Sequence, residues 1–397
     1  MRDGWKFLPL SSVSSESKNI KWKDIAKDKQ YRYIDLTSVS REMKSITEPQ
    51  LINKDNAPSR AQRIIQTDDI LFATTRPTLR RFCIVPTAYD GQICSTGYCV
   101  IRPNKEEILP SWIFYLLSSD LFYDYIEPLQ TGATYPAVTD TDVRGYLAPI
   151  PSLAEQQRIV DILDEAFEKI DVLKANAEQN LQDAKALFQA ALRKELKPKD
   201  GWKRVPLSSV SFGSKNIKWK DVSEDTQYEY IDLTSVDRGT KSITAPQQIC
   251  KTNAPSRAQR IIQTDDVIFA TTRPTLRRFC IIPADYDGQI CSTGYCVIRP
   301  NKEVVLPSWI FYLLSSDLFY DYIEPLQTGA NYPAVTDADV RGYVIPIPSL
   351  SEQQDIVSRL DTLNNHCKTL QTNCEKTIKL CTDLKQALLR KAFNGEL

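Results

Sequence analysis

The chain has 397 residues with 50 basic and 50 acidic side chains, so its formal net charge is zero. The length predicts two or three domains with sizeable cores, and the neutral total neither indicates nor excludes a polyanionic partner. The sequence contains no run of about 18 apolar residues, which excludes an apolar membrane-spanning helix. Its first residues, MRDGWKFLPL, lack the hydrophobic region of a signal peptide. We therefore expect a cytoplasmic protein without membrane contacts.

Two copies of one sequence make up the chain. Residues 197 positions apart correspond from end to end without a gap, so that Trp5 matches Trp202 and Trp112 matches Trp309. Over residues 56–153, eleven of 98 positions differ from the second copy, whereas the final part of each copy agrees in pattern more than in identity. A repeat of this length is a duplicated domain and not a solenoid unit. We infer that the two globular parts do nearly the same task.

The globular part of each copy has the composition of a mixed α and β domain. Segments of strand composition, separated by turn signals such as Asp90–Gly91, span residues 31–39, 68–75, 81–86 and 97–103. One helix is predicted over residues 109–129, starting at Pro110 and Ser111 and ending before Pro128. Its large side chains are expected in the core, namely Trp112, Tyr115, Leu116 and Phe122.

Charge is unevenly placed within each copy. Between Ala57 and Phe82 there are five arginines and two aspartates, whereas between Glu106 and Asp142 there are seven acidic residues and no basic one. The neutral total therefore conceals a basic face that could meet phosphates. Arginine is the side chain suited to bidentate contacts with guanine and phosphate.

The segment TTRPTLRR, at residues 74–81 and again at 271–278, is the main candidate for nucleic-acid contact. Three arginines, threonines and a stiffening proline suit a loop that enters a groove, although an ordinary solvated arginine loop is the alternative. Residues 17–23 and 130–138 are further candidates. The predicted DNA-binding residues of the first copy are Lys21, Arg60, Arg63, Arg76, Thr78, Arg80 and Arg81. Those of the second copy are Lys218, Arg257, Arg260, Arg273, Thr275, Arg277 and Arg278.

A long helix is predicted at the end of each copy, after an apolar strand stopped by prolines. Ser152 and Ser349 are the N-caps, and Glu155 and Glu352 follow three residues later as in a capping box. At ~1.5 Å per residue each helix would be roughly 65 Å long, which exceeds one small domain. Apolar residues alternate at spacings of four and three, the pattern of a coiled coil. The alternative is two amphipathic helices, each on its own domain.

The expected seam of the first helix consists of Ile159, Leu163, Ala166, Ile170, Leu173, Ala177, Asn180, Ala184, Leu187 and Ala191. That of the second helix consists of Ile356, Leu360, Leu363, Cys367, Leu370, Cys374, Thr377, Cys381, Leu384 and Leu388. Free thiols in this position act as small hydrophobic groups that fill the helix interface.

Catalytic chemistry has little material in this sequence. The chain has one histidine, His366, and it lacks a glycine-rich phosphate loop and the (D/N)PP(Y/F) motif of amino-methyltransferases. Asp68 and Asp69 are better explained as a turn before a strand than as a nuclease carboxylate cluster. The ten cysteines contain no close CxxC pair, which favours a reducing compartment over a disulfide framework. We expect no catalytic residue, no bound cofactor and no metal site.

The motif IPIPSL(A/S)EQQxIVxxLD at the start of each long helix, and LLRKAFNGEL at the end of the chain, resemble conserved regions of type I restriction–modification specificity subunits. The order of globular domain and long helix, repeated twice, matches that family over the whole chain. The resemblance implies a non-catalytic subunit that reads a split target in double-stranded DNA. It also implies that the subunit docks two adenine-N6 methyltransferase subunits, which would carry S-adenosylmethionine, and through them restriction subunits.

Two other classes of function stay open. One is a coiled-coil adaptor with two protein-binding heads. The other is a self-contained nuclease or methyltransferase, which the missing motifs disfavour. Salt-dependent binding to duplex DNA separates a DNA specificity subunit from the adaptor, because counterion release makes the affinity for DNA fall steeply with salt concentration.

Connectivity limits how the two helices can pair. Lys197 to Gly201 span roughly 17 Å at most. If the helices were parallel, the second domain would have to reach from one end of a ~65 Å rod to the other, but a domain of this size has a radius of gyration near 15 Å. Paired helices must therefore be antiparallel. The expected fold class is α+β, with two near-identical globular α/β target recognition domains separated by two long antiparallel coiled-coil helices in pseudo-two-fold symmetry. The expected boundaries are 1–151 and 197–348 for the recognition domains, and 152–196 and 349–397 for the helices.

Three further expectations follow from that arrangement. Antiparallel pairing would place Ala166 beside Cys381, Ala177 beside Leu370, Asn180 beside Cys367, and Ala184 beside Leu363. The outer helix faces, with Gln156, Gln157, Gln353 and Gln354, should carry methyltransferase contacts. Two near-identical readers should see the same bases on opposite strands, so the target should be an interrupted palindrome.

Overall fold

The computed structural model describes residues 4–397. Its contacts divide the chain into two compact units, of which the first joins residues up to Ala177 with Lys376–Leu397 and the second is Glu178–Glu375. Each unit therefore contains one globular domain, one part of the first long helix and one part of the second. We call the globular parts the first domain (residues 4–151) and the second domain (residues 201–348), and describe each unit by itself.

The strands of the first domain are β1 Lys6–Pro9, β2 Ser14–Ser15, β3 Tyr31–Ile34, β4 Gln50–Ile52, β5 Ala61–Ile64, β6 Ile70–Ala73, β7 Phe82–Ile84, β8 Ile93–Ser95, β9 Tyr98–Pro103 and β10 Leu147–Ile150. Its helices are α1 Pro110–Ser118, α2 Asp120–Ile126 and α3 Asp140–Arg144, and α4 Leu153–Glu195 follows. Its 3₁₀ turns are η1 Leu10–Ser12, η2 Trp22–Asp24, η3 Pro77–Leu79, η4 Thr87–Tyr89 and η5 Glu127–Leu129.

The second domain repeats these elements. Its strands are β11 Lys203–Pro206, β12 Ser211–Phe212, β13 Tyr228–Ile231, β14 Gln247–Ile249, β15 Ala258–Ile261, β16 Val267–Ala270, β17 Phe279–Ile281, β18 Ile290–Ser292, β19 Tyr295–Pro300 and β20 Val344–Ile347. Its helices are α5 Pro307–Ser315, α6 Asp317–Ile323 and α7 Asp337–Arg341, followed by α8 Leu350–Phe393. Its 3₁₀ turns are η6 Leu207–Ser209, η7 Trp219–Asp221, η8 Pro274–Leu276, η9 Ala284–Tyr286 and η10 Glu324–Leu326.

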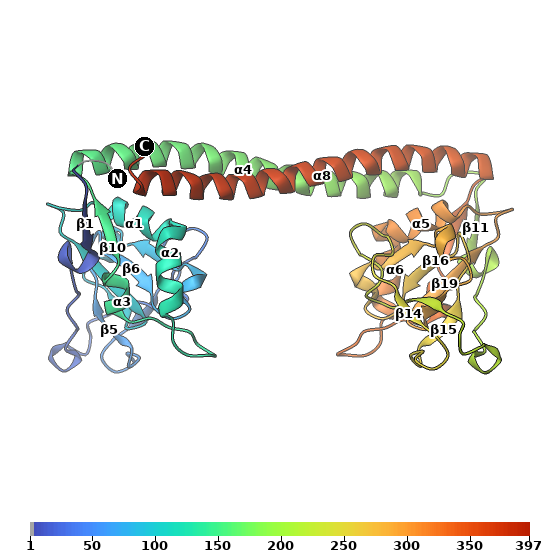
Figure 1. The fold of residues 1–397 in the computed structure, drawn as a ribbon, viewed down its shortest axis with the longest axis horizontal. Helices are drawn as coiled ribbons and strands as arrows, with labels where there is room; N and C mark the ends of the chain where they lie inside the picture. Colours follow the sequence, from blue (N-terminus) through green and yellow to red (C-terminus); the bar gives the residue numbers. More distant parts are fainter. Residues whose placement is uncertain (1–3) are drawn as a thin grey trace. The chain divides into compact units, whose positions relative to one another are not determined.

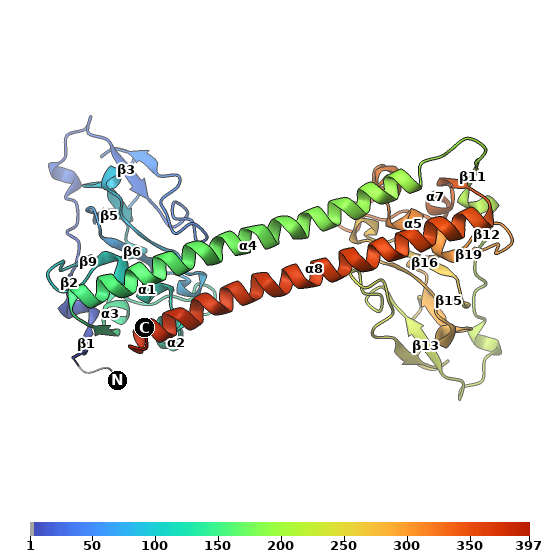
Figure 2. The ribbon, with the colours of Figure 1, turned by 90° about the horizontal axis from the view of Figure 1, so that it is seen from above.

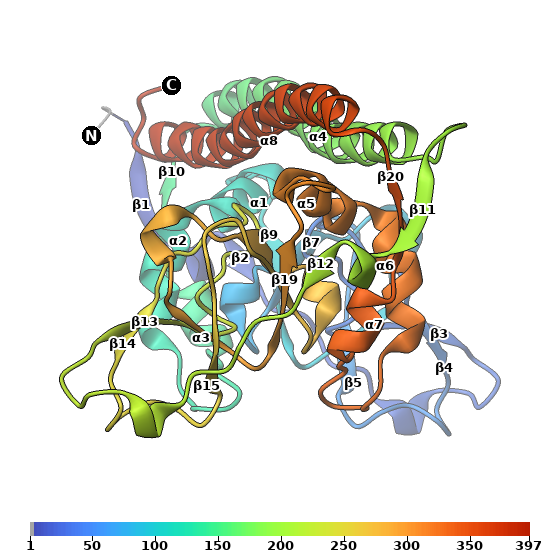
Figure 3. The same cartoon turned by 90° about the vertical axis from the view of Figure 1, so that its right-hand side faces the viewer.

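In the first domain two four-stranded sheets and one ribbon carry the fold (Figure 1). One sheet has the order β2-β9-β6-β7 and is antiparallel throughout. The other has the order β4-β3-β8-β5, in which β3 and β8 are parallel. Strands β1 and β10 form the antiparallel ribbon that leads into α4. In the second domain β11 and β20 lie side by side in the same way (Figure 3).

Strand β6 explains why this domain has two cores. All four of its residues are buried, and side chains alternate between the faces of a strand. Ile70 and Phe72 therefore enter a core with α1, α2 and the long helices, whereas Leu71 and Ala73 enter a second core against the other sheet. The apolar run that predicts a strand at residues 68–75 is thus a strand buried on both faces.

The helix predicted over residues 109–129 is wrong in one respect. Ser119 has an extended backbone (φ −80°, ψ 139°), which ends α1, and its hydroxyl accepts a hydrogen bond from the backbone N–H of Leu121 as the N-cap of α2. The helix is broken because serine at a cap competes with the helical backbone bond. The predicted core residues are confirmed, since Trp112, Leu116 and Phe122 are fully buried and Tyr115 is 6% exposed.

Within the first unit the start of α4 and the end of α8 run antiparallel, as expected (Figure 2). The Arg158 guanidinium donates to the Leu397 carbonyl at 2.7 Å, and Lys385 pairs with Asp171 at 2.6 Å. Phe393 of α8 packs edge-on against Trp112 with ring centroids 5.0 Å apart. The long helices therefore complete the core of this domain.

The second unit has the matching arrangement. Leu192 of α4 and Leu360 of α8 are buried in the same core as Trp309. Arg359 of α8 pairs with Glu195 of α4 at 2.7 Å, and the Gln189 amide donates to the Ser315 carbonyl at 3.1 Å.

The predicted helix register is wrong. It would place Lys385 opposite residue 162, but Lys385 binds Asp171, nine residues or about 13 Å further along α4. A lysine–aspartate pair cannot bridge that offset, so the pairing of Ala166 with Cys381 does not hold. In the second unit Arg359 is shifted in the same direction, which argues against the pairs Asn180–Cys367 and Ala184–Leu363. Ala177 and Leu370 belong to different units, and their pairing stays a prediction.

The predicted seam is confirmed at Ile159, Leu163, Ile356 and Leu360 and at every seventh position after Leu163 and Leu360, and it is wrong at the exposed positions between these. Ile170, Ala177 and Ala184 are buried, but Leu173 and Leu187 are 52% and 55% exposed. In α8 the buried positions are Cys367, Cys374 and Cys381, while Leu370 and Leu384 are exposed. Half-buried residues lie four positions after each buried one, namely Lys174, Leu181, Phe188, Gln371, Ile378 and Lys385. In a helix of 3.6 residues per turn, both the third and the fourth following residue border a seam, so apolar spacing alone does not decide between them.

Candidate nucleic-acid interface

The segment TTRPTLRR of the first domain forms a tight loop around η3. Arg76 precedes η3 with φ 51° and ψ 57°, and Arg80 follows it with φ 54° and ψ 43°. Both backbones are left-handed, a conformation that costs roughly 1–2 kcal/mol for a residue with a Cβ. Such strain persists only where the surroundings hold the backbone in place, and it concentrates at functional sites.

The loop is held on both sides. On one side the backbone N–H of Arg76 donates to the Pro136 carbonyl at 2.7 Å, and Thr75 forms a β-bridge with Ala137. On the other side the Lys44 amine donates to the Arg80 carbonyl. Two of the three segments singled out in the sequence, residues 74–81 and 130–138, therefore lie side by side. Figure 1 shows the loop around residues 131–137 at the end of the domain that faces away from α4.

The Arg76 side chain is exposed and lies over the ring of Tyr135, with the guanidinium carbon 4.9 Å from the ring centroid. Tyr135 is itself 66% exposed. A cation–π contact of this kind orients the guanidinium, and apart from one long bond to the Thr134 carbonyl at 3.5 Å its N–H groups can donate outward. In the second domain Arg273 lies over Tyr332 at the same distance of 4.9 Å.

A hollow of about 600 Å³ opens beside this pair in the second domain. It is lined by three of the predicted arginines together with threonine, leucine, alanine and tyrosine: Leu233, Thr234, Arg257, Thr272, Arg273, Leu276, Arg278, Tyr332 and Ala334. The first domain has the same residue at every one of these positions: Leu36, Thr37, Arg60, Thr75, Arg76, Leu79, Arg81, Tyr135 and Ala137. Guanidinium and hydroxyl groups around an open hollow can donate to phosphate and base edges.

Arg80 and Arg63 do not face outward as freely as Arg76. Arg80 pairs with Asp120 at 2.6 Å and lies over the Tyr123 ring, with its guanidinium carbon 4.0 Å from the centroid. Arg63 pairs with Asp140 and is 19% exposed. Their counterparts Arg277 and Arg260 make the same ion pairs with Asp317 and Asp337. A DNA contact from these side chains stays a prediction, and it requires the ion pairs to open.

The other predicted residues differ in their surroundings. Arg81 and Arg278 donate to the carbonyls of Leu36 and Leu233, at the edge of the hollow. Exposed side chains, free to meet a ligand, are those of Lys21, Arg60, Thr78, Lys218, Arg257 and Thr275. Residues 17–23 run beside β5, because the Ile20 N–H donates to the Gln62 carbonyl at 2.7 Å and the Trp22 indole N–H to that of Ala61 at 2.7 Å. All three candidate segments thus border β5 or the arginine loop.

Lys44 is a member of the site that the sequence analysis missed. Burial, assisted by the charge of Arg80, lowers the pKa of its amine to about 8. The amine lies 4.3 Å from the centroid of the Phe82 ring while it donates to the Arg80 carbonyl. No sequence signal identifies Lys44, because it reaches the loop across 36 residues. Tyr135 lay within the candidate segment 130–138, and its stacking on Arg76 was likewise not evident from spacing.

Carboxylates near the site have structural partners. Asp69 is 1% exposed and binds Arg102 through both oxygens at 2.8 and 2.7 Å, and it also accepts from the Gln66 N–H at 2.8 Å. Asp68 pairs with Lys105 at 2.6 Å. Within residues 4–397, no group of three or more His, Cys, Asp or Glu side chains is placed to hold a metal ion. The described helices include none long and apolar enough to cross a membrane.

The chain thus contains two domains of one kind, each with an arginine-lined loop and each followed by a long helix. The sequence profile described as "Type I restriction modification DNA specificity domain" matches residues 2–182 and 199–380. The EcoKI specificity subunit of Escherichia coli K12 is 24% identical over 439 aligned positions, which cover 100% of this chain and 89% of that protein. The StySPI specificity subunit of Salmonella potsdam is 24% identical over 325 positions, 77% of this chain and 69% of that protein.

Two solved structures resemble the whole chain. A chain from a structural study of complex assembly and conformational transition in the type I R-M system has a TM-score of 0.84 at 28% identity, covering 100% of this chain and 99% of its own. The HsdS subunit from Thermoanaerobacter tengcongensis has a TM-score of 0.63 at 29% identity, covering 100% and 98%. The chain belongs to the family of type I restriction–modification DNA specificity subunits.

Proposed function

We propose that this protein reads a bipartite, interrupted palindrome in double-stranded DNA and positions adenine-N6 methyltransferase subunits on it. Each domain reads one half-site with its arginine loop and with the nine residues that line the hollow of the second domain or match them in the first. The protein itself is non-catalytic in this proposal. S-adenosylmethionine is bound by two methyltransferase subunits, and restriction subunits join through them.

The observation that supports the palindrome is the identity of the residues that line the hollow with their counterparts in the first domain. The nine residues around the hollow of the second domain are the same nine in the first. The difference nearest to them along the chain is Thr134 against Asn331, and the hydrogen bond of Arg76 to Thr134, at 3.5 Å, goes to the backbone carbonyl. Two readers with the same side chains in the same backbone conformation select the same bases. A protein with internal symmetry selects a target with matching symmetry, as dimeric helix-turn-helix proteins do.

Support for the partners comes from the family and from the helices. Relatives are named as subunits of type I restriction enzymes, and such a subunit acts with others. The motif PSLxEQQ begins both long helices although the remainder of α4 and α8 diverged. Gln157 and Gln354 of this motif are exposed and available to a partner.

Sequencing of modified adenines tests the proposal most directly. The chain is co-expressed with the methyltransferase subunit of its own system in a host without other adenine methylation. We expect one methylated motif with two half-sites that are reverse complements of each other. A motif with two unrelated half-sites would overturn the palindrome and leave a DNA specificity role intact.

Salt-dependent binding separates this function from that of a protein adaptor. Affinity for duplex DNA should fall steeply between about 50 and 200 mM salt, because phosphate contacts release counterions. An adaptor with two protein-binding heads predicts no duplex binding, and that result would overturn the DNA-reading function altogether.

A further inference from the structure

Residues 17–32 carry very different charge in the two domains. The first domain has six cations there, Lys18, Lys21, Lys23, Lys27, Lys29 and Arg32, against two anions, Asp24 and Asp28. In the second domain, residues 214–229 have three cations, Lys215, Lys218 and Lys220, against four anions, Asp221, Glu224, Asp225 and Glu229. The formal charge is therefore +4 in one copy and −1 in the other. Two domains with the same nine residues around the candidate site thus differ by five charges in this one segment.

The six cations of the first domain, which we call the basic patch, are all exposed. Lys29 lies 5.2 Å from the centroid of the Tyr31 ring, and the guanidinium of Arg32 lies 5.5 Å from that of the Tyr89 ring. The two rings thus hold these cations at the domain surface, where both side chains remain in contact with solvent. In the second domain Glu229 stands where Arg32 does, and it accepts a hydrogen bond from Gln248 at 3.3 Å.

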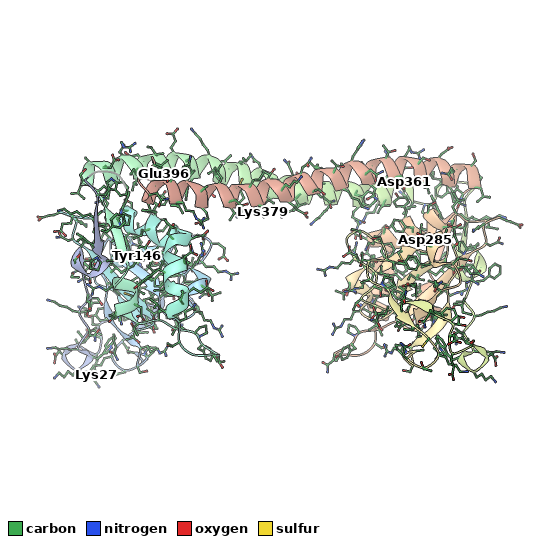
Figure 4. All side chains as sticks on the ribbon, viewed as in Figure 1. Lys27, Tyr146, Asp285, Asp361, Lys379 and Glu396 are labelled. Carbon is green, nitrogen blue, oxygen red and sulfur yellow. The ribbon has the colours of Figure 1, made fainter. Side chains whose placement is uncertain are left out.

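The basic patch adjoins the candidate interface. Ile20 and Trp22 fasten this segment to Gln62 and Ala61 of β5, directly after Arg60. Arg60 corresponds to Arg257, which lines the hollow of the second domain. Figure 4 shows Lys27 at the end of the first domain that faces away from α4, the end at which the loop around residues 131–137 also lies. A duplex seated at the hollow would extend along this end of the domain.

We propose that the basic patch is a phosphate-binding surface of the first domain that the second domain lacks, so that the two domains hold DNA with unequal strength. The inference rests on the proposed function, and it adds a division of labour within it. Both domains read the same bases, because phosphate contacts carry affinity and register but no direct sequence information. The first domain supplies most of the electrostatic attraction for DNA. Residues 214–229 of the second domain, with a formal charge of −1, weaken that attraction at the second domain.

Exchange of residues between the domains tests this division. The variant K27E/K29T/R32E gives the first domain the residues of the second, and E224K/T226K/E229R does the reverse. The same fold already carries each set of residues at these positions, so both variants should fold. Affinity for a mixed-sequence DNA duplex is measured with the full chain over a range of salt concentrations. The slope of log K against log salt changes by about 0.9 for each phosphate contact.

We expect the first variant to flatten the slope by about two to three and the second to steepen it by a similar amount. The matched control K185E/K194E/K376Q changes the net charge by the same five units at exposed positions of α4 and α8. It should leave the slope near that of the wild type. Unchanged slopes in both exchange variants, or an equal change in the control, would overturn the inference. Wild-type protein that binds no duplex would instead overturn the proposed function.

Discussion

Arg76 and Arg80 show how two arginines of one loop take different tasks at the scale of the residue. Both have left-handed backbones, yet the Arg80 guanidinium is bound by Asp120 and lies on Tyr123, whereas that of Arg76 lies on an exposed tyrosine. An arginine held by a carboxylate within its own domain stabilises the loop. An arginine held by a ring and by one long bond to a backbone carbonyl keeps its other donors for a ligand.

Replacement of these two arginines should therefore give different results. If Arg76 reads a guanine edge, R76A should cost about 1–3 kcal/mol on the cognate site and relax one position of one half-site. R273A should relax the mirror position. R80A should weaken binding to cognate and altered sites alike, because it loosens the loop without removing a base contact. Competition binding with single-base variants of the target measures these effects, and equal base-specific losses in R76A and R80A would contradict the assignment.

Lys44 predicts a pH dependence of stability. Burial and the charge of Arg80 lower its pKa in the folded protein to about 8, while an unfolded lysine titrates near 10.4. Between these values the unfolded state binds more protons, so the contribution of this group to folding stability rises as the pH rises from about 8 to about 10.5. The pKa of Lys241 is lowered to about 8 in the same way, by burial and the charge of Arg277.

The double variant K44M/K241M should remove that contribution. Methionine keeps apolar contact with the ring of Phe82 or Phe279 and cannot titrate. Urea unfolding at about pH 7.5 and about pH 10 should show that wild-type stability, relative to the variant, is greater at the higher pH. Parallel pH profiles for the two proteins would show that the buried amines are not responsible.

At the scale of the element, the start of α4 is fixed by one glutamine. Gln156 is fully buried, its amide donates to the carbonyls of Glu107 at 2.9 Å and Pro151 at 3.0 Å, and its oxygen accepts from the Leu109 N–H at 2.9 Å. Gln353 makes the same bonds at the start of α8. The expectation that Gln156 and Gln353 face a partner is therefore wrong. The buried Gln156 side chain satisfies three backbone groups at the start of the helix, which is a structural reason for a glutamine at this position in both copies.

Two adjacent glutamines thus provide a matched pair of variants. Q156A leaves buried backbone groups without partners and should lower the stability of the first unit by about 1–3 kcal/mol. Q157A removes an exposed amide that donates to Asp161 at 2.7 Å and should leave stability nearly unchanged. We expect Q157A/Q354A to weaken co-purification with the methyltransferase at unchanged stability in urea. Undiminished co-purification would show that these glutamines are not part of the docking surface.

At the scale of the whole molecule, the sequence predicts those features that depend on nearby residues. The repeat, the buried strand at Ile70–Ala73 and the start of each long helix follow from local signals, and Ser152 does accept a hydrogen bond from the Glu155 N–H at 3.3 Å. The break at Ser119 was not predicted, because serine inside an apolar segment is a weak signal. The predicted helix register was wrong because apolar spacing does not decide which positions of the two helices lie opposite each other. The ion pair of Lys385 with Asp171 shows the register instead.

The candidate site was predictable as three segments and not as an arrangement of side chains. Composition identified the arginine loop, but Asp120 and Tyr135 decide which arginine is bound and which is available. Those partners lie 40 and 59 residues further along the chain, on elements that only the fold brings to the loop. The same holds for Lys44, whose amine reaches the Arg80 carbonyl from a separate turn.

Helix length should set the distance between the half-sites. The first unit ends at Ala177 in α4 and begins again at Lys376 in α8, so the middle of each long helix is where one unit meets the other along the chain. Insertion of seven residues after Ala177 in α4 and after Cys374 in α8 lengthens each helix by about 10 Å and keeps the seven-residue repeat. At 3.4 Å per base pair, the spacer of the methylated motif should grow by about three base pairs with both half-sites unchanged. Insertion into α4 alone is the control, because mismatched helices should lose methylation. A lengthened pair that still methylates the original spacer would show that the helices do not measure the gap.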